Sequence, residues 1–319
     1  MSSGYDPKGP IFISYRQSDG RPYAELLDNY LRAGGLVPWR DLVDLPPGET
    51  AQRVTEAFDE GISNAILVVT PELLDSQFVP EVEVPKLFAL DEDSGDGRPF
   101  HLLVLNTRHK PGHEDQIDVH APDKLLKRTE NWPPSDANGV RAGVLRNLKQ
   151  YALLDRRGEL RQLYADLLDA RLAARVAELA DKEVTIHTQS RPEGSARSRL
   201  AGVTRSRHLA KNPDDPYDLI VRLRQDRVTG VPSELGMVSL QQTLPLLVDA
   251  LYAHGVEKVK VIAAGHSVLL WALGAALPMT RMKGGSVQAE DIGEHVWGEG
   301  RGRVSAEQQS NRTPCSECG

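Results

Sequence analysis

Short apolar runs and amphipathic stretches alternate along the N-terminal third of the chain. Four apolar runs have the length of strands, at residues 11–15, 36–39, 65–69 and 101–105. The stretches at residues 21–35 and 50–62 carry apolar side chains at helical spacing, and a pair of glycines ends the first of them. Strands without polar alternation, separated by amphipathic helices, predict a parallel sheet that is covered on both faces.

A second alternating block follows a stretch rich in Leu, Ala and Arg, in which helices are predicted at residues 143–154 and 158–179. The strands predicted in this block lie at residues 183–188, 217–223, 258–265 and 285–292, and the helices at residues 239–255 and 267–277. The pattern is again that of an open α/β unit, so we expect an α/β protein with two sheet-bearing parts.

These patterns divide the chain into four parts. We expect an α/β domain at residues 1–136, a helical connector at residues 137–180, a second α/β domain at residues 181–298 and a disordered tail at residues 299–319. The tail is predicted from its polar composition, which is rich in Gly, Ser and Gln and offers little apolar surface to bury.

Composition and charge exclude several classes of protein. The net charge of -7 argues against a non-specific DNA-binding protein, because phosphate neutralisation requires Lys and Arg that acids do not outnumber. No apolar run reaches the roughly 18 residues of a membrane span, and the N-terminus lacks the pattern of a signal peptide. We therefore expect a cytoplasmic protein that binds neither DNA nor a membrane.

The two cysteines, Cys315 and Cys318, form a CxxC pair in the predicted tail. A zinc site would need two more ligands at a matching spacing, and the sequence has no second CxxC and no nearby HxxxH. We expect free thiols and no bound metal, and the role of the pair stays open.

Polar and aromatic side chains follow the first three predicted strands. In an open parallel sheet the carboxyl ends of the strands border the ligand crevice, so the loops that carry these side chains converge. An arginine, aromatic rings and acids at one crevice suit a nucleotide with its pyrophosphate, base and ribose. Neither GxGxxG nor GxxxxGK[ST] is present. The candidates are Ser14, Arg16, Trp39, Asp41, Ser76, Phe78, Glu81 and Glu83.

The motifs FISYR, VPWRD, DLPPGE, ILVVTP and DSQFVPEVE, in this order, resemble a TIR domain over residues 9 to 135. The resemblance implies a flavodoxin-like parallel sheet and either NAD hydrolysis or a non-catalytic role as a signalling scaffold. It also implies self-association through the BB loop, here residues 41–48, and an acid behind the Ser-x-aromatic motif as the catalytic group.

A single carboxylate is enough for this chemistry. Cleavage of the nicotinamide–ribose bond builds positive charge on the ribose, which a carboxylate beside the sugar stabilises. Nicotinamide leaves as a neutral amine, so no general acid is needed. NAD is then the substrate, and no cofactor is expected.

Helical geometry makes Glu81 and Glu83 alternatives, because residues two apart point about 200° away from each other. The spacing usual in the family falls on Val82, one residue from either acid. With Pro80 as the first residue of a helix, Glu81 is exposed at its N-terminus and Glu83 lies further in. We predict Glu83 as the catalytic acid, with Glu81 as second choice. On the alternative interpretation, Glu81 only complements the helix dipole.

A basic segment lies in the second block, in an otherwise acidic chain. Arginine binds phosphates through two parallel hydrogen bonds, so an anionic ligand is one interpretation and a solvated basic loop the other. The loops after two of the strands meet at one sheet edge, where a helix N-terminus favours phosphate. The candidates are Gln189, Ser190, Arg191, Arg197, Arg199, Arg205, Arg207, Gly265, His266, Ser267 and, for base stacking, Trp271.

Two of these candidates have other interpretations. Trp271 taken alone is typical of a core aromatic residue. The sequence AAGHSVLLW imitates the nucleophile elbow of a serine hydrolase at Ser267, but Leu269 stands where the second glycine is required. A serine hydrolase is therefore a remote alternative.

The segments YDLIVRLRQDRV, YAHGVEKVKVIAAGHS and LLWALGAAL are similar to a SAVED domain over residues 155–298, a family related to CARF sensors. The resemblance implies that a cyclic oligonucleotide, with cyclic tri-adenylate as the expected activator, binds here and drives assembly into an oligomer or filament. A TIR–SAVED chain would then be an NAD-depleting effector of CBASS anti-phage immunity. The alternative function, from a class other than enzymes, is a TIR scaffold that catalyses no reaction.

Overall fold

The computed structural model of the 319-residue chain describes fourteen segments, to which all structural statements below refer. They are residues 4–40, 54–55, 58–59, 61–76, 78–92, 100–128, 145, 148–152, 156–179, 182–189, 218–225, 231–264, 267–277 and 287–291. The predicted tail and the cysteine pair lie outside these residues.

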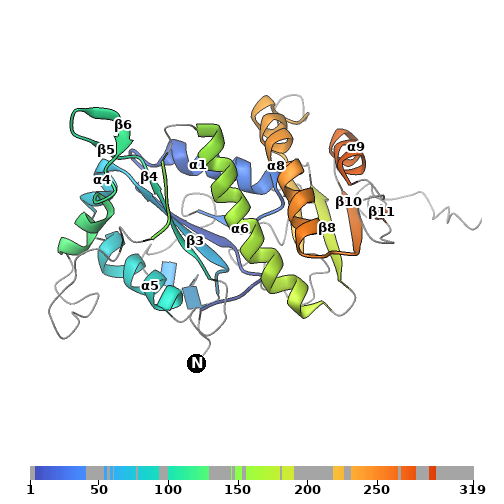
Figure 1. The fold of residues 1–319 in the computed structure, drawn as a ribbon, viewed down its shortest axis with the longest axis horizontal. Coiled ribbons are helices and arrows are strands. Elements are labelled where there is room, and N and C mark those ends of the chain that lie inside the picture. Colours follow the sequence, from blue (N-terminus) through green and yellow to red (C-terminus); the bar gives the residue numbers. More distant parts are fainter. Residues whose placement is uncertain are drawn as a thin grey trace, which may run out of the picture.

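The N-terminal unit is built on a five-stranded parallel sheet in the order β2-β1-β3-β4-β7 (Figure 1). In chain order this is 2-1-3-4-5, which is the order of flavodoxin-like sheets. The predicted parallel sheet is thus confirmed. Its strands are β1 Ile11–Ser14, β2 Pro38–Trp39, β3 Asn64–Val69, β4 Leu102–Asn106 and β7 Gln150–Ala152.

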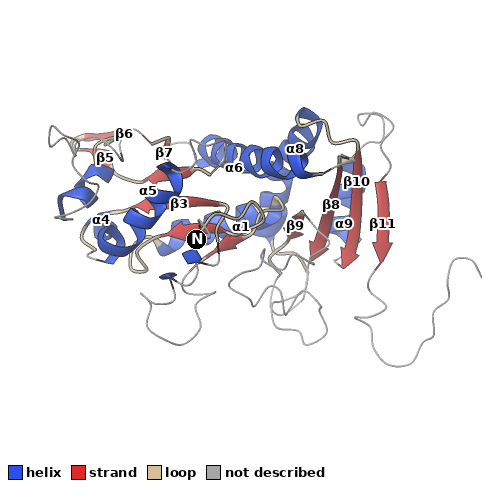
Figure 2. Cartoon of the chain, turned by 90° about the horizontal axis from the view of Figure 1, so that it is seen from below, coloured by secondary structure: helices blue, strands red, loops and turns tan. Residues whose placement is uncertain are grey.

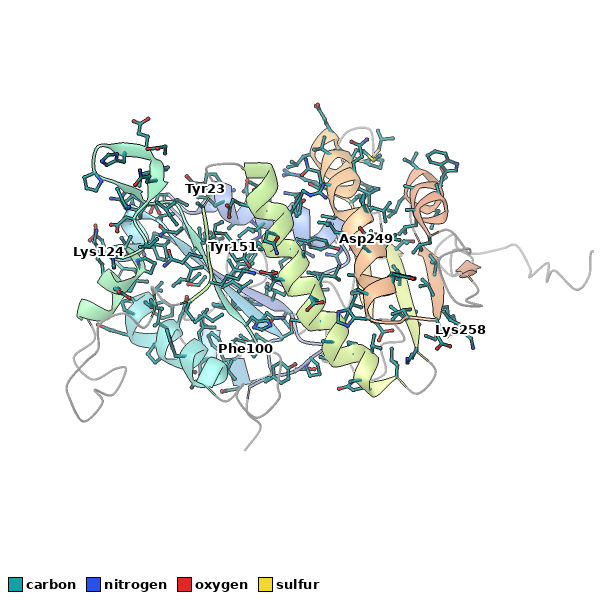
Figure 3. All side chains as sticks on the ribbon, viewed as in Figure 1. Tyr23, Phe100, Lys124, Tyr151, Asp249 and Lys258 are labelled. Atoms are coloured by element: carbon teal, nitrogen blue, oxygen red, sulfur yellow. The ribbon has the colours of Figure 1, made fainter. Side chains whose placement is uncertain are left out.

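Strand β7 corrects one prediction. The stretch rich in Leu, Ala and Arg predicts a helix over residues 143–154, but Gln150–Ala152 pair with β4 as an edge strand. Tyr151 points toward the following helix, where its hydroxyl donates to Asp166 (Figure 3). A three-residue strand is too short for periodicity to reveal, and pairing with the open edge of β4 decides its conformation. The sheet therefore extends beyond residue 136, the predicted domain end.

Both faces of β1 are buried, as its apolar sequence predicts. Ile11 and Ile13 belong to a core that α1 (Arg21–Ala33) covers, and Phe12 packs against Phe58 on the other face. Of the six described residues inside the predicted helix 50–62, four are helical and the last two, Gly61 and Ile62, are not. The further elements of this unit are α4 Pro71–Leu74, the π-turn η1 Val79–Glu83, α5 Val84–Glu92, the hairpin strands β5 His109–Lys110 and β6 His113–Ile117, and the 3-10 helix η3 Pro122–Arg128.

The second unit contains a four-stranded parallel sheet in the order β11-β10-β8-β9. In chain order this is again 2-1-3-4, as in the first sheet. Figure 2 shows β8, β10 and β11 side by side, with α9 behind them. All four predicted strands are therefore present: β8 Glu183–Gln189, β9 Leu219–Arg222, β10 Lys258–Ala264 and β11 Val287–Asp291; the helices are α8 Glu234–Ala253 and α9 Ser267–Ala276.

Helix α6 (Arg156–Glu178) runs diagonally between the two sheets and joins them into one body (Figure 1). It packs against α8 and α1, and a single hydrophobic core contains side chains from β1 and β3 as well as from β8, β9 and β10. The Tyr164 hydroxyl of α6 donates to Gly34 O at 2.7 Å, and a Cβ at Gly34 would collide with the tyrosine ring. The predicted connector is thus part of a shared core.

The turn after α1 also touches the second sheet directly. Gly35 has a φ of +90°, a conformation that glycine adopts without strain, and its carbonyl accepts a hydrogen bond from Ile220 N of β9 at 2.9 Å.

None of the helices in the described segments is long and apolar enough to cross a membrane.

Candidate functional site

A cavity of about 500 Å³ opens at the carboxyl end of β1. Its walls come from residues 12–18, from Trp39 at the end of β2, from Val54, and from the segment between Ser76 and Glu83. The volume lies in the range of small-molecule sites, and the position at the switch point of an open parallel sheet is where ligands bind in such folds.

The structure brings most of the predicted N-terminal site residues together. Ser14, Arg16, Trp39, Ser76, Phe78 and Glu83 all line this cavity. Glu81 does not line it, and its side chain is exposed. Asp41 lies outside the described residues. The geometric expectation for the two acids is therefore met: one faces the crevice and the other faces solvent.

The two acids lie on the π-turn η1. Val84 N donates to Val79 O, which is the five-residue spacing of a π-helix. In an α-helix the ring of Pro85 would clash with the carbonyl of Glu81, and proline has no amide to donate to it. The wider turn removes this conflict. Pro80 lies at the second position of the turn, whereas the sequence predicted it at the first.

Glu83 is buried, and Ser14 holds it. The Ser14 hydroxyl donates to Oε2 of Glu83 at 2.5 Å, and the two side chains are 1% and 7% exposed. A carboxylate is buried in a protein only where hydrogen bonds or charges compensate for lost water, and this bond supplies part of that compensation. The sequence predicted Ser14 as a substrate contact. It gave no signal for the contact with Glu83, because the two residues are 69 positions apart.

Trp39 forms a wall of the cavity and belongs to the core at the same time. Its ring is 1% exposed and stacks on Phe12 with centroids 5.0 Å apart and planes at 20°. Trp39 is therefore both a lining residue of the site and a core residue at the end of β2. Phe78, which is half-buried, lines the same cavity.

The loop after β1 is anchored by Asp19, a residue that the sequence did not single out. Its carboxylate accepts from Thr70 Oγ1 and from Glu72 N, both at 2.8 Å, and so ties the loop to the start of α4. Gly20 N donates to Arg16 O at 2.8 Å, and a Cβ at Gly20 would lie 2.7 Å from that oxygen. This compact turn holds the exposed side chain of Arg16 at the rim of the cavity.

Described residues on both sides of the predicted BB segment line the same cavity. Trp39 precedes residues 41–53 and Val54 follows them, and both line the cavity. Arg40 between them is held by Asp28 of α1, with Nη2 3.4 Å from Oδ2. Asp28 also binds Arg32 at 2.8 Å, so the start of the loop is fixed to α1 by a buried cluster of charges.

Few of the candidates in the second unit fall on described residues. Gln189 ends β8 beside Ala264 of β10, so the carboxyl ends of these two strands meet as predicted. Ser267 begins α9 and is exposed, and Trp271 is 76% exposed, which contradicts its interpretation as a core aromatic. The remaining candidates lie outside the described residues: Ser190, Arg191, Arg197, Arg199, Arg205, Arg207, Gly265 and His266.

His187 and Arg222 are buried polar residues of the second sheet that the sequence did not indicate. The strand register places them on the face of the sheet opposite Val184 and Ile186, which belong to the shared core. Burial lowers the pKa of His187 to about 4, and the charge of Arg222 acts in the same direction. The ring is therefore neutral at physiological pH. Among the described residues, no cluster of His, Cys, Asp and Glu could hold a metal ion.

Comparison with known proteins locates one family in the chain. Residues 11–129 match the family model described as TIR domain. This range includes every residue that lines the cavity. TIR domains in general hydrolyse NAD or act as signalling scaffolds, and they commonly self-associate. A search of curated proteins found no match. The SAVED resemblance of the second unit stays a prediction.

Proposed function

Because residues 11–129 are a TIR domain, we propose that this protein is an NAD hydrolase that cleaves the bond between nicotinamide and ribose. The observation that carries the proposal is the position of Glu83, a buried carboxylate on the wall of a cavity of nucleotide-compatible volume. A scaffold requires no carboxylate at this place, whereas stabilisation of a developing cation does.

The reaction needs only groups that the cavity contains. The bond between ribose C1′ and the ring nitrogen breaks, and its electron pair leaves with neutral nicotinamide. Glu83 would stabilise the positive charge left on the ribose until water adds to C1′ and loses a proton. Arg16 at the rim suits the pyrophosphate, and Phe78 and Trp39 suit the flat rings of the substrate.

The finer part of the proposal is that the second unit senses a cyclic oligonucleotide, with cyclic tri-adenylate as the expected activator. The carboxyl ends of β8 and β10 lie side by side, Trp271 is exposed, and a helix begins at Ser267. These three observations support a ligand site at this edge of the sheet. The basic residues between Arg191 and Lys211 would supply phosphate contacts.

Assembly of subunits through the BB loop would complete the proposed mechanism. Trp39 and Val54, the described residues on either side of residues 41–53, line the cavity, which supports a substrate site next to the subunit contact. An enzyme that is activated in this way would deplete NAD only when the ligand is present. Such control suits an anti-phage effector of the CBASS type in the cytoplasm.

The proposal is tested by incubating the full-length protein with NAD, alone and with a panel of cyclic di- and trinucleotides, and measuring released nicotinamide. Release should require one member of the panel. Glu83→Gln should lower kcat by about 100-fold or more, because it removes a charge that acts in the transition state.

Glu81→Gln is the matched control and should keep kcat within about threefold, since Glu81 is exposed and outside the cavity. Loss of activity in Glu81→Gln alone would assign the reaction to the other acid. Absence of nicotinamide release under every condition would leave the scaffold as the function. In cells, Glu83→Gln should abolish any reduction of phage plaques by the intact protein.

A further inference from the structure

Ser14 occupies a position where the strand pattern calls for an apolar residue. It follows Ile11, Phe12 and Ile13 as the last residue of β1, and it shares the face of Phe12, which packs in an apolar core. Its side chain is 1% exposed, so its hydroxyl has little access to bulk water although Ser14 lines the cavity. The hydroxyl instead donates to Oε2 of Glu83 at 2.5 Å.

We propose that Ser14 is a positioning residue for the reaction, which orients the Glu83 carboxylate through the Oγ–Oε2 hydrogen bond. The inference rests on the proposed NAD hydrolysis but names a role that a substrate-binding serine would not have. With Oε2 fixed by a strand residue, the plane of the carboxylate is fixed, and with it the direction of Oε1.

Glu83 needs a hydrogen bond that orients its carboxylate because it lies at the end of a π-turn. This turn is the less regular part of the helix, whereas β1 is an inner strand of the sheet, paired with β2 and β3 on its two sides. A donor on the rigid strand transfers its position to the acid on the turn. Since Ser14 donates to the carboxylate, it also favours the ionised form, the form that stabilises a cation.

The first test compares wild type and Ser14→Ala in the full-length protein, with the activator that the wild type requires. We expect kcat to fall about 10- to 100-fold, the usual effect of a lost hydrogen bond to a charged group, with KM changed less than about threefold. The acidic limb of the kcat/KM profile should move to higher pH by about one unit, because the ionised carboxylate loses its donor.

Two further variants separate positioning from folding. Ser14→Cys, which is nearly isosteric and a weak donor, should fall between wild type and Ser14→Ala in both kcat and pH profile. Ser63→Ala removes another buried serine hydroxyl, which bonds Pro10 O at 3.4 Å next to β3 and does not line the cavity. It should leave the acidic limb unchanged, even where it lowers the melting temperature.

The titration of Glu83 is also measurable without activity. In protein labelled with ¹³C at glutamate carboxyls, the Glu83 signal is the one that Glu83→Gln lacks, and it should titrate at higher pH in Ser14→Ala. A wild type that releases no nicotinamide would overturn the proposed function, and this titration would still decide the role of Ser14. An active wild type with unchanged kcat, pH profile and titration in Ser14→Ala would overturn only the inference on Ser14.

Discussion

His187 shows how a single residue makes the stability of this protein depend on pH. The ring lies in the middle of β8, 3% exposed, on a sheet face that also carries Thr185 and Arg222. Burial lowers the pKa to about 4 from its ordinary value of 6.5, so the folded state holds the ring neutral where the unfolded chain begins to protonate it. The unfolded state therefore binds more protons between these two values.

The stability that the neutral ring contributes is complete above pH 6.5 and is lost as the pH falls toward 4. Its size is about 3 kcal/mol, since each pKa unit corresponds to about 1.4 kcal/mol. Thermal unfolding of the full-length protein over this pH range should show a smaller loss of stability in His187→Gln than in wild type. His113→Gln in the exposed hairpin is the control and should follow the wild type. Parallel pH curves for wild type and His187→Gln would contradict the assignment.

At the scale of single residues, the sequence predicts which side chains lie at the site better than it predicts which side chains bond to each other. That Glu81 and Glu83 point to different sides follows from their spacing of two residues, which is local geometry. The bonds from Ser14 to Glu83 and from Asp19 to Thr70 join strands and turns distant in sequence. Their formation depends on how the turns close, and a single sequence carries no sign of it.

The conformation of the π-turn η1 determines where the side chain of Glu83 lies. Proline at position 85 removes the amide that an α-helix would use, so Val84 N bonds Val79 O and the turn widens. Because every residue in such a turn is displaced around the axis relative to an α-helix, the direction of Glu83 depends on the turn. The conformation of this element is therefore part of the proposed site.

Pro85→Ala should convert the turn to α-helical bonding, since alanine offers an amide to Glu81 O and removes the clash. We expect kcat for NAD to fall at least about tenfold while the melting temperature stays equal or rises, because proline inside a helix costs about 3 kcal/mol. Calorimetry and nicotinamide release measure the two effects.

Pro80→Ala is the matched control for this change. Pro80 lies at the second position of the turn, where the amide has no partner inside the helix, so both kcat and melting temperature should change little. Full activity of Pro85→Ala would show that the π-turn is not required to place Glu83.

Elements with clear periodicity are predicted from the sequence, and elements decided by their neighbours are not. Strands β1, β3 and β4 carry apolar runs of sufficient length, and their parallel order follows from the alternation with helices. Strand β7 has three residues in a stretch whose composition predicts a helix, so pairing with the edge of β4 makes it a strand.

At the scale of the whole molecule, the two sheets are parts of one folded body. Helix α1 begins just after the loop that holds Arg16 at the cavity and ends at Gly34 and Gly35, where Gly35 O bonds Ile220 N of the second sheet. One helix thus connects the rim of the candidate site to β9. A displacement of the second sheet has a direct path to that rim, which the predicted sensor and enzyme arrangement would require.

Two arginines of α6 bind the second sheet to the N-terminal segment. Arg171 donates to the carbonyls of Pro7, Lys8 and Gly9, and to Asp218 O at 3.5 Å. Burial and the neighbouring Arg175 lower its pKa to about 10, so it stays charged at neutral pH. Asp218 ties the contact to the second sheet, because its carboxylate accepts from Thr185 N at 2.8 Å.

Asp218→Asn should destabilise both units together, since the Asp218 carboxylate also binds Arg175 through Nε at 3.1 Å and Nη2 at 2.7 Å. Removal of one charge of a buried pair costs about 3 kcal/mol or more, because the other charge stays buried without its partner.

If the shared core makes the chain unfold as one unit, calorimetry should show a single transition at lower temperature, and amide exchange in β1 should accelerate along with that in β8. Asp169→Asn, which removes an exposed contact with His254, should cost less than about 1 kcal/mol. Two separate transitions, of which Asp218→Asn moves only one, would show that the units fold independently and that no coupling through α1 and α6 connects the second sheet to the cavity.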